Sequence, residues 1–94
     1  MASRILEKIR ALVQAGLYVM TLHAEEEMEN DGFEIFDVEC ALLNGRIVSR
    51  QTERQSKERK YGIRGRSADN TRNLMVVVKL GLTGLLVILT IYAD

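Results

Sequence analysis

Residues 74–92 read LMVVVKLGLTGLLVILTIY, two aliphatic runs separated by the short connection Gly81-Leu-Thr-Gly84. Each run has the length of a buried strand, and a glycine-bounded connection suits a tight hairpin. A single membrane-spanning helix is the competing interpretation, but Lys79 near its centre would cost about 2.5–3.5 kcal/mol. The stretch therefore predicts two antiparallel strands, at 74–80 and 85–92, that form much of the hydrophobic core.

Upstream of this hairpin the apolar pattern changes from a helical period to an alternating one near Gly45. Alternation predicts strands at 46–54 and 59–66, joined to the hairpin by a turn at 67–72. Helical spacing predicts three helices before residue 45, with Ser3, Thr21 and Asp37 as their N-caps. Residues 17–20 are short and apolar, and suit either an edge strand or an extended lead into the second helix.

Helices followed by strands predict an α+β fold formed by one domain over residues 1–94. The helices, at about 3–45, would pack on one face of a four-stranded antiparallel sheet at about 46–93. In the last strand we expect the aliphatic set to meet the helices: Leu85, Val87, Leu89 and Ile91. The opposite face of the sheet would then collect Lys60, Arg64, Arg66, Lys79, Thr90 and Tyr92.

The 13 basic and 13 acidic side chains cancel in number, but they are segregated along the chain. Most acidic residues precede Gly45 and most basic residues follow it. This asymmetry suits either a polyanion-binding face or two halves of one domain that attract each other. A lone cysteine, Cys40, and no visible secretory signal lead us to expect a cytoplasmic protein without a membrane anchor.

Three motifs occur in an order that resembles a bacterial family, domain of unknown function 4258. An extended lead into His23-Ala24 is followed by an acidic helix, and Asp31-Gly32 is followed by the helix that closes at Asn44-Gly45. The third motif is a basic strand, 59–65, followed by a hydrophobic strand and Thr90-Ile-Tyr92. The family itself is similar to RelE-like toxins and other small endoribonucleases of the barnase, EndoU and colicin group.

This resemblance implies a RelE-like fold and metal-independent cleavage of RNA on the open face of the sheet, with a protein antitoxin as partner. The catalytic candidates are His23 for proton transfer, Arg64 for stabilising phosphate charge and Tyr92 for placing substrate. The candidates for binding the RNA backbone are Arg50, Arg54, Lys60, Arg66 and Thr90. Many relatives carry an arginine in the His-Ala helix, where this chain has the acidic run 25–27.

Each of these residues also has a structural interpretation. His23 suits a local contact that fixes the entry of its helix, and the basic side chains suit a solvated strand surface or ion pairs with the acidic helices. A non-catalytic module that binds nucleic acid, a protein or a second copy of the chain is therefore the alternative function. One histidine beside a solvated acidic run is a poor metal site, and we expect neither a metal nor another cofactor.

Overall fold

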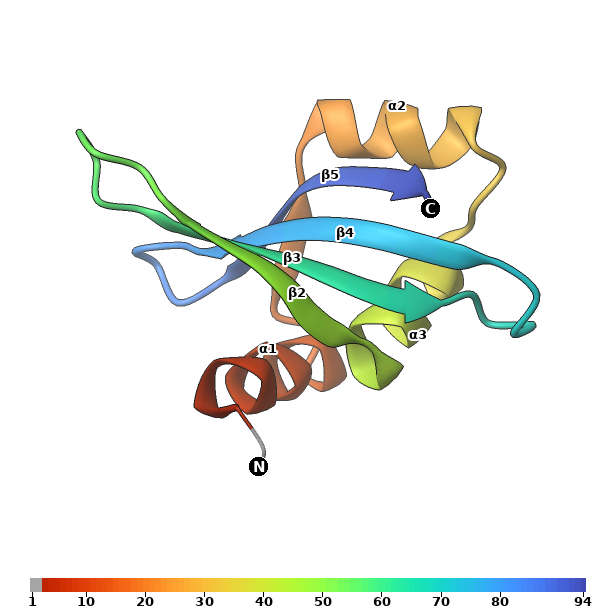
Figure 1. Cartoon of the computed structure of the whole chain (residues 1–94), viewed down its shortest axis with the longest axis horizontal. Helices are drawn as coiled ribbons and strands as arrows, with labels where there is room; N and C mark the ends of the chain where they lie inside the picture. The colour runs from red at the N-terminus through yellow and green to blue at the C-terminus, as the bar shows by residue number, and fades with distance from the viewer. Residues whose placement is uncertain (1–2) are drawn as a thin grey trace.

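The computed structural model describes residues 3–94, which form three helices and five strands (Figure 1). Their bounds, in chain order, are α1 (Arg4–Gln14), β1 (Tyr18–Met20), α2 (Leu22–Asn30), α3 (Ile35–Asn44), β2 (Arg46–Thr52), β3 (Arg59–Arg66), β4 (Asn73–Leu80) and β5 (Leu86–Ala93). The α+β class and the order of helices before the main strands are confirmed.

Two of the three predicted helix caps are confirmed. The Ser3 hydroxyl accepts a hydrogen bond from the Leu6 N–H, and the Thr21 hydroxyl accepts one from the Ala24 N–H. The third cap was predicted wrongly, because α3 begins three residues earlier, with Glu34 as its N-cap. Asp37 instead accepts from the Glu34 N–H at 2.9 Å, the reciprocal bond of a capping box.

The sheet has five strands in the order β1-β5-β4-β3-β2 and is mixed (Figure 1). β1 pairs in parallel with β5, whereas every other neighbouring pair is antiparallel. The four-stranded antiparallel prediction is therefore incomplete, since residues 18–20 add a fifth strand. Three residues are too few to show an alternating pattern, and their partners, Leu86–Ile88, lie at the far end of the chain.

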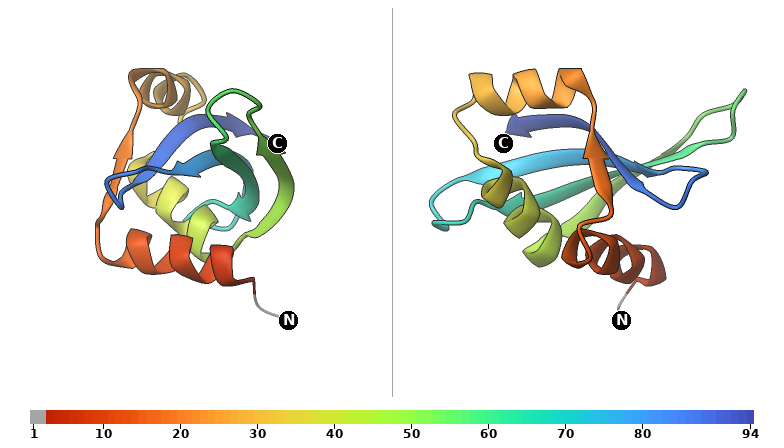
Figure 2. Two further views of the ribbon diagram at one scale, coloured as in Figure 1. Left: turned by 90° about the vertical axis from the view of Figure 1, so that its left-hand side faces the viewer. Right: turned by 180° about the vertical axis from the view of Figure 1, so that it is seen from behind.

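Helices α1 and α3 cover one face of the sheet, and α2 lies along β5 (Figures 1 and 2). The core between sheet and helices contains Ile9, Val13, Val38, Ala41, Leu42, Tyr61, Ile63, Leu74, Val76, Val78, Leu86, Ile88 and Ile91. Gly65 lets α3 approach β3 closely, because a Cβ at that position would overlap the Ala41 carbonyl. The face opposite α1 and α3 carries no helix and is called the open face below.

The predicted parity of the last strand is wrong for most of its length. Leu86 and Ile88 are fully buried, so Leu85, Val87 and Leu89 do not form the helix-facing set. Ile91 is also fully buried, which agrees with the prediction for that residue alone. Both parities of this strand are aliphatic, so its composition carries no signal that distinguishes the two faces.

A β-bulge explains how Ile88 and Ile91 can share one face although they are three residues apart. Val78 pairs with Ile88, but its neighbour Val77 pairs with Thr90, so Leu89 is the extra residue in β5. An extra residue reverses the alternation of side chains beyond it. Thr90 therefore lies on the open face.

Tyr18 and Glu39 join β1 to α3 through a side-chain hydrogen bond. The Tyr18 hydroxyl donates to Glu39 Oε2 at 2.5 Å. Burial, followed by this bond to the carboxylate, raises the pKa of Tyr18 to about 12. Because the folded-state pKa exceeds that of the unfolded chain, the neutral phenol stabilises the fold below about pH 10, and this stabilisation is lost as the pH rises towards 12.

Replacing Tyr18 by phenylalanine should remove this alkaline sensitivity. Between pH 9 and 12 the wild type should lose about 1 kcal/mol more unfolding free energy than Tyr18→Phe, the full linkage value being reduced because the phenol is partly exposed. Urea unfolding of both proteins across this range measures the difference. Parallel curves for the two proteins would contradict the Tyr18–Glu39 contact.

Candidate functional site

Cross-strand register brings the predicted basic residues together on the open face. In β3, Tyr61 and Ile63 are buried under the helices, so Lys60, Arg64 and Arg66 point the other way. Lys60 faces Lys79 of β4 across the strand pair. The structure therefore places Lys60, Arg64, Arg66 and Lys79 on one face of the sheet, which α1 and α3 do not cover.

One row across the sheet joins the two central candidates on this face. Arg46 of β2 pairs with Arg64 of β3, Arg64 pairs with Met75 of β4, and Met75 pairs with Tyr92 of β5. The next row on the same face ends at Thr90, opposite Val77. Sequence reasoning did not identify Arg46 or Met75 as parts of this surface, because strand pairing was needed to align them.

The structure does not bring Arg50 and Arg54 to the open face. Arg50 pairs with Tyr61, and both residues line a hollow of about 240 Å³ with Ile5 of α1, on the helix-covered side. Arg54 lies in the turn between β2 and β3. A second bulge lies between Ile47 and Ser49. Because of this extra residue, Arg46 and Arg50 point to opposite faces of the sheet although they are four residues apart.

Two cations of the open face have acidic partners that sequence reasoning missed. Arg64 Nε donates to the Asp94 carboxylate, and this bond raises the pKa of the guanidinium further above its usual value. The Lys79 ammonium donates to Glu58 Oε2 at 3.0 Å. These pairs reduce the charge of the face near Asp94 and Glu58, whereas Lys60 and Arg46 form no ion pair within residues 3–94.

A hollow of about 500 Å³ lies where β2 begins and β3 ends. Its lining is strongly basic and consists of Asn44, Gly45, Arg46, Arg64, Gly65, Arg66, Asn70 and Asn73. We call it the arginine hollow. Arg66 is fixed in its wall, because Nε donates to Asn70 Oδ1 at 2.5 Å and Nη1 donates to Asn73 Oδ1 at 3.2 Å. No carboxylate lines this hollow.

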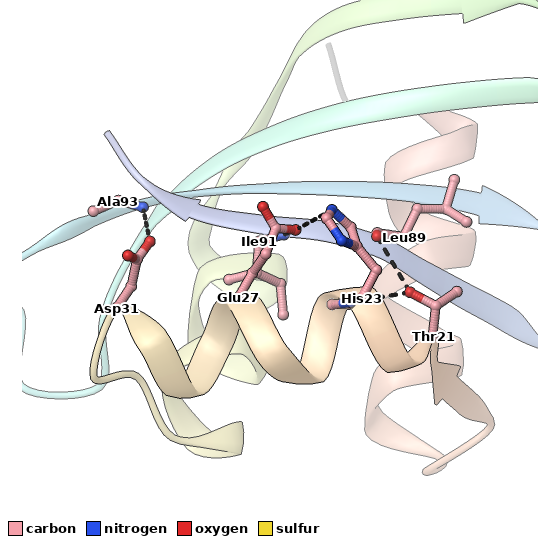
Figure 3. Close-up of polar contacts among 8 residues, drawn as sticks. Thr21, His23, Glu27, Asp31, Leu89, Ile91 and Ala93 are labelled. Atoms are coloured by element: carbon pink, nitrogen blue, oxygen red, sulfur yellow. Dashed lines mark hydrogen bonds and ion pairs between the residues drawn. The ribbon is translucent and has the colours of Figure 1, made fainter.

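His23 lies away from this cluster, on α2 at the edge of β5 (Figure 3). Its side chain is 67% exposed, and Nε2 is 3.0 Å from Glu27 Oε1 one helical turn later. The same Glu27 oxygen accepts a hydrogen bond from the Ile91 N–H at 3.2 Å. The polar contact of His23 is therefore with Glu27, whereas Arg64 is bonded to Asp94.

Three polar side chains of α2 and its cap bind the edge of β5 in place of another strand (Figure 3). The Thr21 hydroxyl donates to the Leu89 carbonyl at 3.3 Å, and Asp31 Oδ2 accepts from the Ala93 N–H at 3.0 Å. Glu27 occupies the position between them. The acidic run is thus not uniformly solvated: Glu25 and Glu26 are exposed, but Glu27 protects the strand edge.

The chemistry available on the open face is cationic and phenolic. Within residues 3–94 no group of three histidine, cysteine or acidic side chains is arranged to hold a metal ion. Tyr92 is 40% exposed beside the Arg64–Asp94 pair, so a guanidinium and a phenol are presented together. Such a pair can bind a phosphate and stack on or donate to the group attached to it.

In the part of the chain described, no helix is long and apolar enough to cross a membrane. Comparison with known proteins identifies one family, Domain of unknown function (DUF4258), which matches residues 20–93. Neither the curated proteins nor the solved structures gave a significant match. The match extends from the last residue of β1 to the end of β5 and so includes β2 to β5 of the open face. The chain therefore belongs to the family described as Domain of unknown function (DUF4258).

Proposed function

We propose that this protein binds single-stranded RNA along the open face of its sheet. The observation that carries the proposal is the alignment of cations from β2, β3 and β4 on one face without a covering helix. Lysine and arginine side chains along a groove or face bind a nucleic-acid backbone by neutralising phosphates and releasing counterions. The motif order resembles the family described as domain of unknown function 4258, and the expected similarity of that family to RelE-like ribonucleases supports RNA as the nucleic acid.

Each part of the face has a distinct role in this proposal. Arg64 and Lys60 bind two phosphates that are not adjacent in the RNA, because four residues of β3 separate them by about 13 Å on the same face. Tyr92 and Met75 form an exposed-to-intermediate apolar platform beside Arg64, on which a base can stack. Thr90 adds a hydroxyl that can contact the backbone on the β5 side.

Cleavage of the bound RNA is the second candidate function, and the proximity of Arg64 and Tyr92 favours it. In metal-free cleavage the ribose 2′-hydroxyl loses its proton to water as its oxygen attacks the phosphorus, and the bond from phosphorus to the 5′-oxygen breaks, which yields a 2′,3′-cyclic phosphate and a 5′-hydroxyl. Arg64 would stabilise the charge on phosphorus, and Tyr92 would donate a proton to the leaving oxygen. An antitoxin protein that covers this face would then be the natural partner.

Binding ranks ahead of cleavage because of where His23 lies. A general base must come within hydrogen-bond reach of the 2′-hydroxyl it deprotonates. His23 sits on α2 beyond β5 and contacts Glu27, whereas Arg64 is on β3, two strands from β5. Tyr92, by contrast, lies on the open face itself, in the same cross-strand row as Arg64.

Titration of a labelled twelve-nucleotide single-stranded RNA with the protein tests both candidates. We expect binding whose affinity falls steeply between about 50 and 200 mM salt, since several phosphate contacts contribute. Gel analysis of the same mixtures separates binding from cleavage: products that His23→Ala leaves unchanged and Arg64→Ala removes would establish cleavage without the histidine. Absence of any RNA binding at 50 mM salt would refute the proposed function.

Replacing Asp94 by asparagine should strengthen RNA binding. Asp94 accepts a hydrogen bond from Arg64 and competes with phosphate for the same guanidinium. Asparagine keeps the side-chain shape but removes the negative charge, so we expect affinity to rise about threefold to tenfold at low salt. Glu25→Gln, on the exposed side of α2, removes one negative charge away from the open face and serves as the control for net charge. An equal gain in both variants would show that Asp94 does not compete at the site.

A further inference from the structure

The accessible polar groups of the arginine hollow are almost all hydrogen-bond donors. Asn70 Oδ1 and Asn73 Oδ1 are both occupied by the Arg66 guanidinium. Their amino groups are therefore the ends left to face a ligand. Arg46 adds a guanidinium that makes no ion pair within residues 3–94. A hollow that offers donors from several directions is a site for an anion with several acceptor oxygens.

The charge of the hollow matches a doubly charged ligand better than a singly charged one. Three guanidiniums line it, and Asp94, bound to Arg64, is the one carboxylate that pairs with any of them among the described residues. The carbonyl of Gly45, the C-cap of α3, would repel an anion, but it accepts a hydrogen bond from Arg10 Nη2 at 2.8 Å. Positive charge is thus left in excess after the internal pairs are formed.

The wall that carries Asn70 is held rigidly. Asp69 accepts hydrogen bonds from the Ser67 hydroxyl at 2.6 Å and from the Thr71 hydroxyl at 2.7 Å. These bonds lower the pKa of Asp69 to about 2 and connect its carboxylate to residues on both sides of it in the turn. Asn44 closes the other side, where its Oδ1 accepts from the Arg66 N–H at 3.0 Å. The donors are therefore positioned before a ligand arrives.

We propose that the arginine hollow binds the terminal phosphate monoester of an RNA strand. A monoester carries about −1.5 to −2 charges at pH 7 and three terminal oxygens. A phosphodiester within the strand carries one charge and two such oxygens, so it would leave donors of Arg46, Asn70 and Asn73 unused. The hollow lies at the end of the open face, where β3 leads into the turn, and the remaining nucleotides would extend along β3 towards Lys60. This inference rests on the proposed RNA binding.

Binding of six-nucleotide RNAs that differ only in their ends tests the inference. The first RNA carries a 5′-phosphate, the second carries a 3′-phosphate, and the third has hydroxyl groups at both ends. In each RNA the dye is attached at an internal position or at the end that carries no phosphate. We expect one phosphorylated form to bind about tenfold tighter than the hydroxyl form at about 100 mM salt. Equal binding of all three would overturn the terminal site while leaving RNA binding by the open face intact.

Asn73→Asp tests whether the amino group of Asn73 donates a hydrogen bond to the phosphate. The aspartate keeps an oxygen for Arg66 but replaces the amino donor by a carboxylate, so the preference for a phosphorylated end should fall to about twofold or less. Asn30→Asp, on exposed α2, makes the same chemical change away from the hollow and should retain the preference. Arg46→Ala gives a second loss variant should Asn73→Asp fail to fold.

Competition with uridine 5′-monophosphate distinguishes a strand end from a free mononucleotide. A strand end is supported if the mononucleotide displaces the phosphorylated RNA only at concentrations about a hundredfold above the RNA dissociation constant, because it lacks the contacts along the open face. Displacement at equal concentration would overturn the assignment to a strand end. If the mononucleotide binds but no RNA does, the proposed function fails as well.

Discussion

Replacing Lys60 and Arg64 together by alanine is expected to weaken binding of single-stranded RNA about a hundredfold at 50 mM salt. Both side chains lie on the open face of β3, and each is expected to contribute about a factor of ten through one phosphate contact. The slope of log affinity against log salt should also fall by about 1.4, since each phosphate contact on a single strand contributes about 0.7. Fluorescence anisotropy at several salt concentrations measures both quantities.

Arg50→Ala with Arg59→Ala is the matched control for this double variant. It removes the same total charge from β2 and β3, but Arg50 pairs with Tyr61 and Arg59 has the parity of Tyr61, on the side that the helices cover. We expect less than about a threefold loss of affinity, from the change in net charge alone. Equal losses in the two double variants would mean that RNA, if bound, is not bound by the open face.

Leu86→Ala is expected to lower the free energy of unfolding by about 3–5 kcal/mol, whereas Leu85→Ala should lower it by about 1 kcal/mol or less. Leu86 is fully buried between sheet and helices, and its truncation leaves a cavity as well as a loss of apolar contact. Leu85 precedes β5 and is partly exposed. In a domain whose total stability is about 5–14 kcal/mol, the first change approaches complete unfolding.

The two leucine variants make the same chemical change at adjacent positions with opposite parity, so they test the observed register of β5 directly. Chemical denaturation with unchanged m-values gives the two free-energy differences. The larger loss at Leu85 would restore the parity expected from the sequence and would reject the register in which Leu86 faces the core. The position of Tyr92 would not change, because both registers place Tyr92 on the open face.

The elements that the sequence predicted well are those with a strong local signal. Ser3 and Thr21 cap the first two helices as expected, because a hydroxyl before an apolar repeat is a local pattern. β3 was predicted with its observed bounds, since Tyr61 and Ile63 alternate with charged residues. In β5 both parities are aliphatic, so the face that meets the helices was decided by pairing with β4 and by the bulge at Leu89.

The candidate site was predictable in its cations but not in its contacts. Alternation in β3 and β4 was enough to place Lys60, Arg64 and Lys79 on one face. The partners Asp94 and Glu58 are 30 and 21 residues away along the chain, and no local pattern connects them to Arg64 and Lys79. The contact of Glu27 with the Ile91 N–H also joins residues far apart along the chain. The contact of Glu27 with His23, by contrast, is local, because the two residues are one helical turn apart.

NMR of the arginine side chains during titration with single-stranded RNA tests the central claim most directly. We predict that the Nε–H resonances of Arg46 and Arg64 shift progressively and saturate, whereas those of Arg50 and Arg59 remain within about a tenth of that change. The first two residues lie on the open face and the others on the side of α1 and α3. Shifts confined to Arg50 and Arg59, or no shifts at an RNA excess, would contradict RNA binding by the open face.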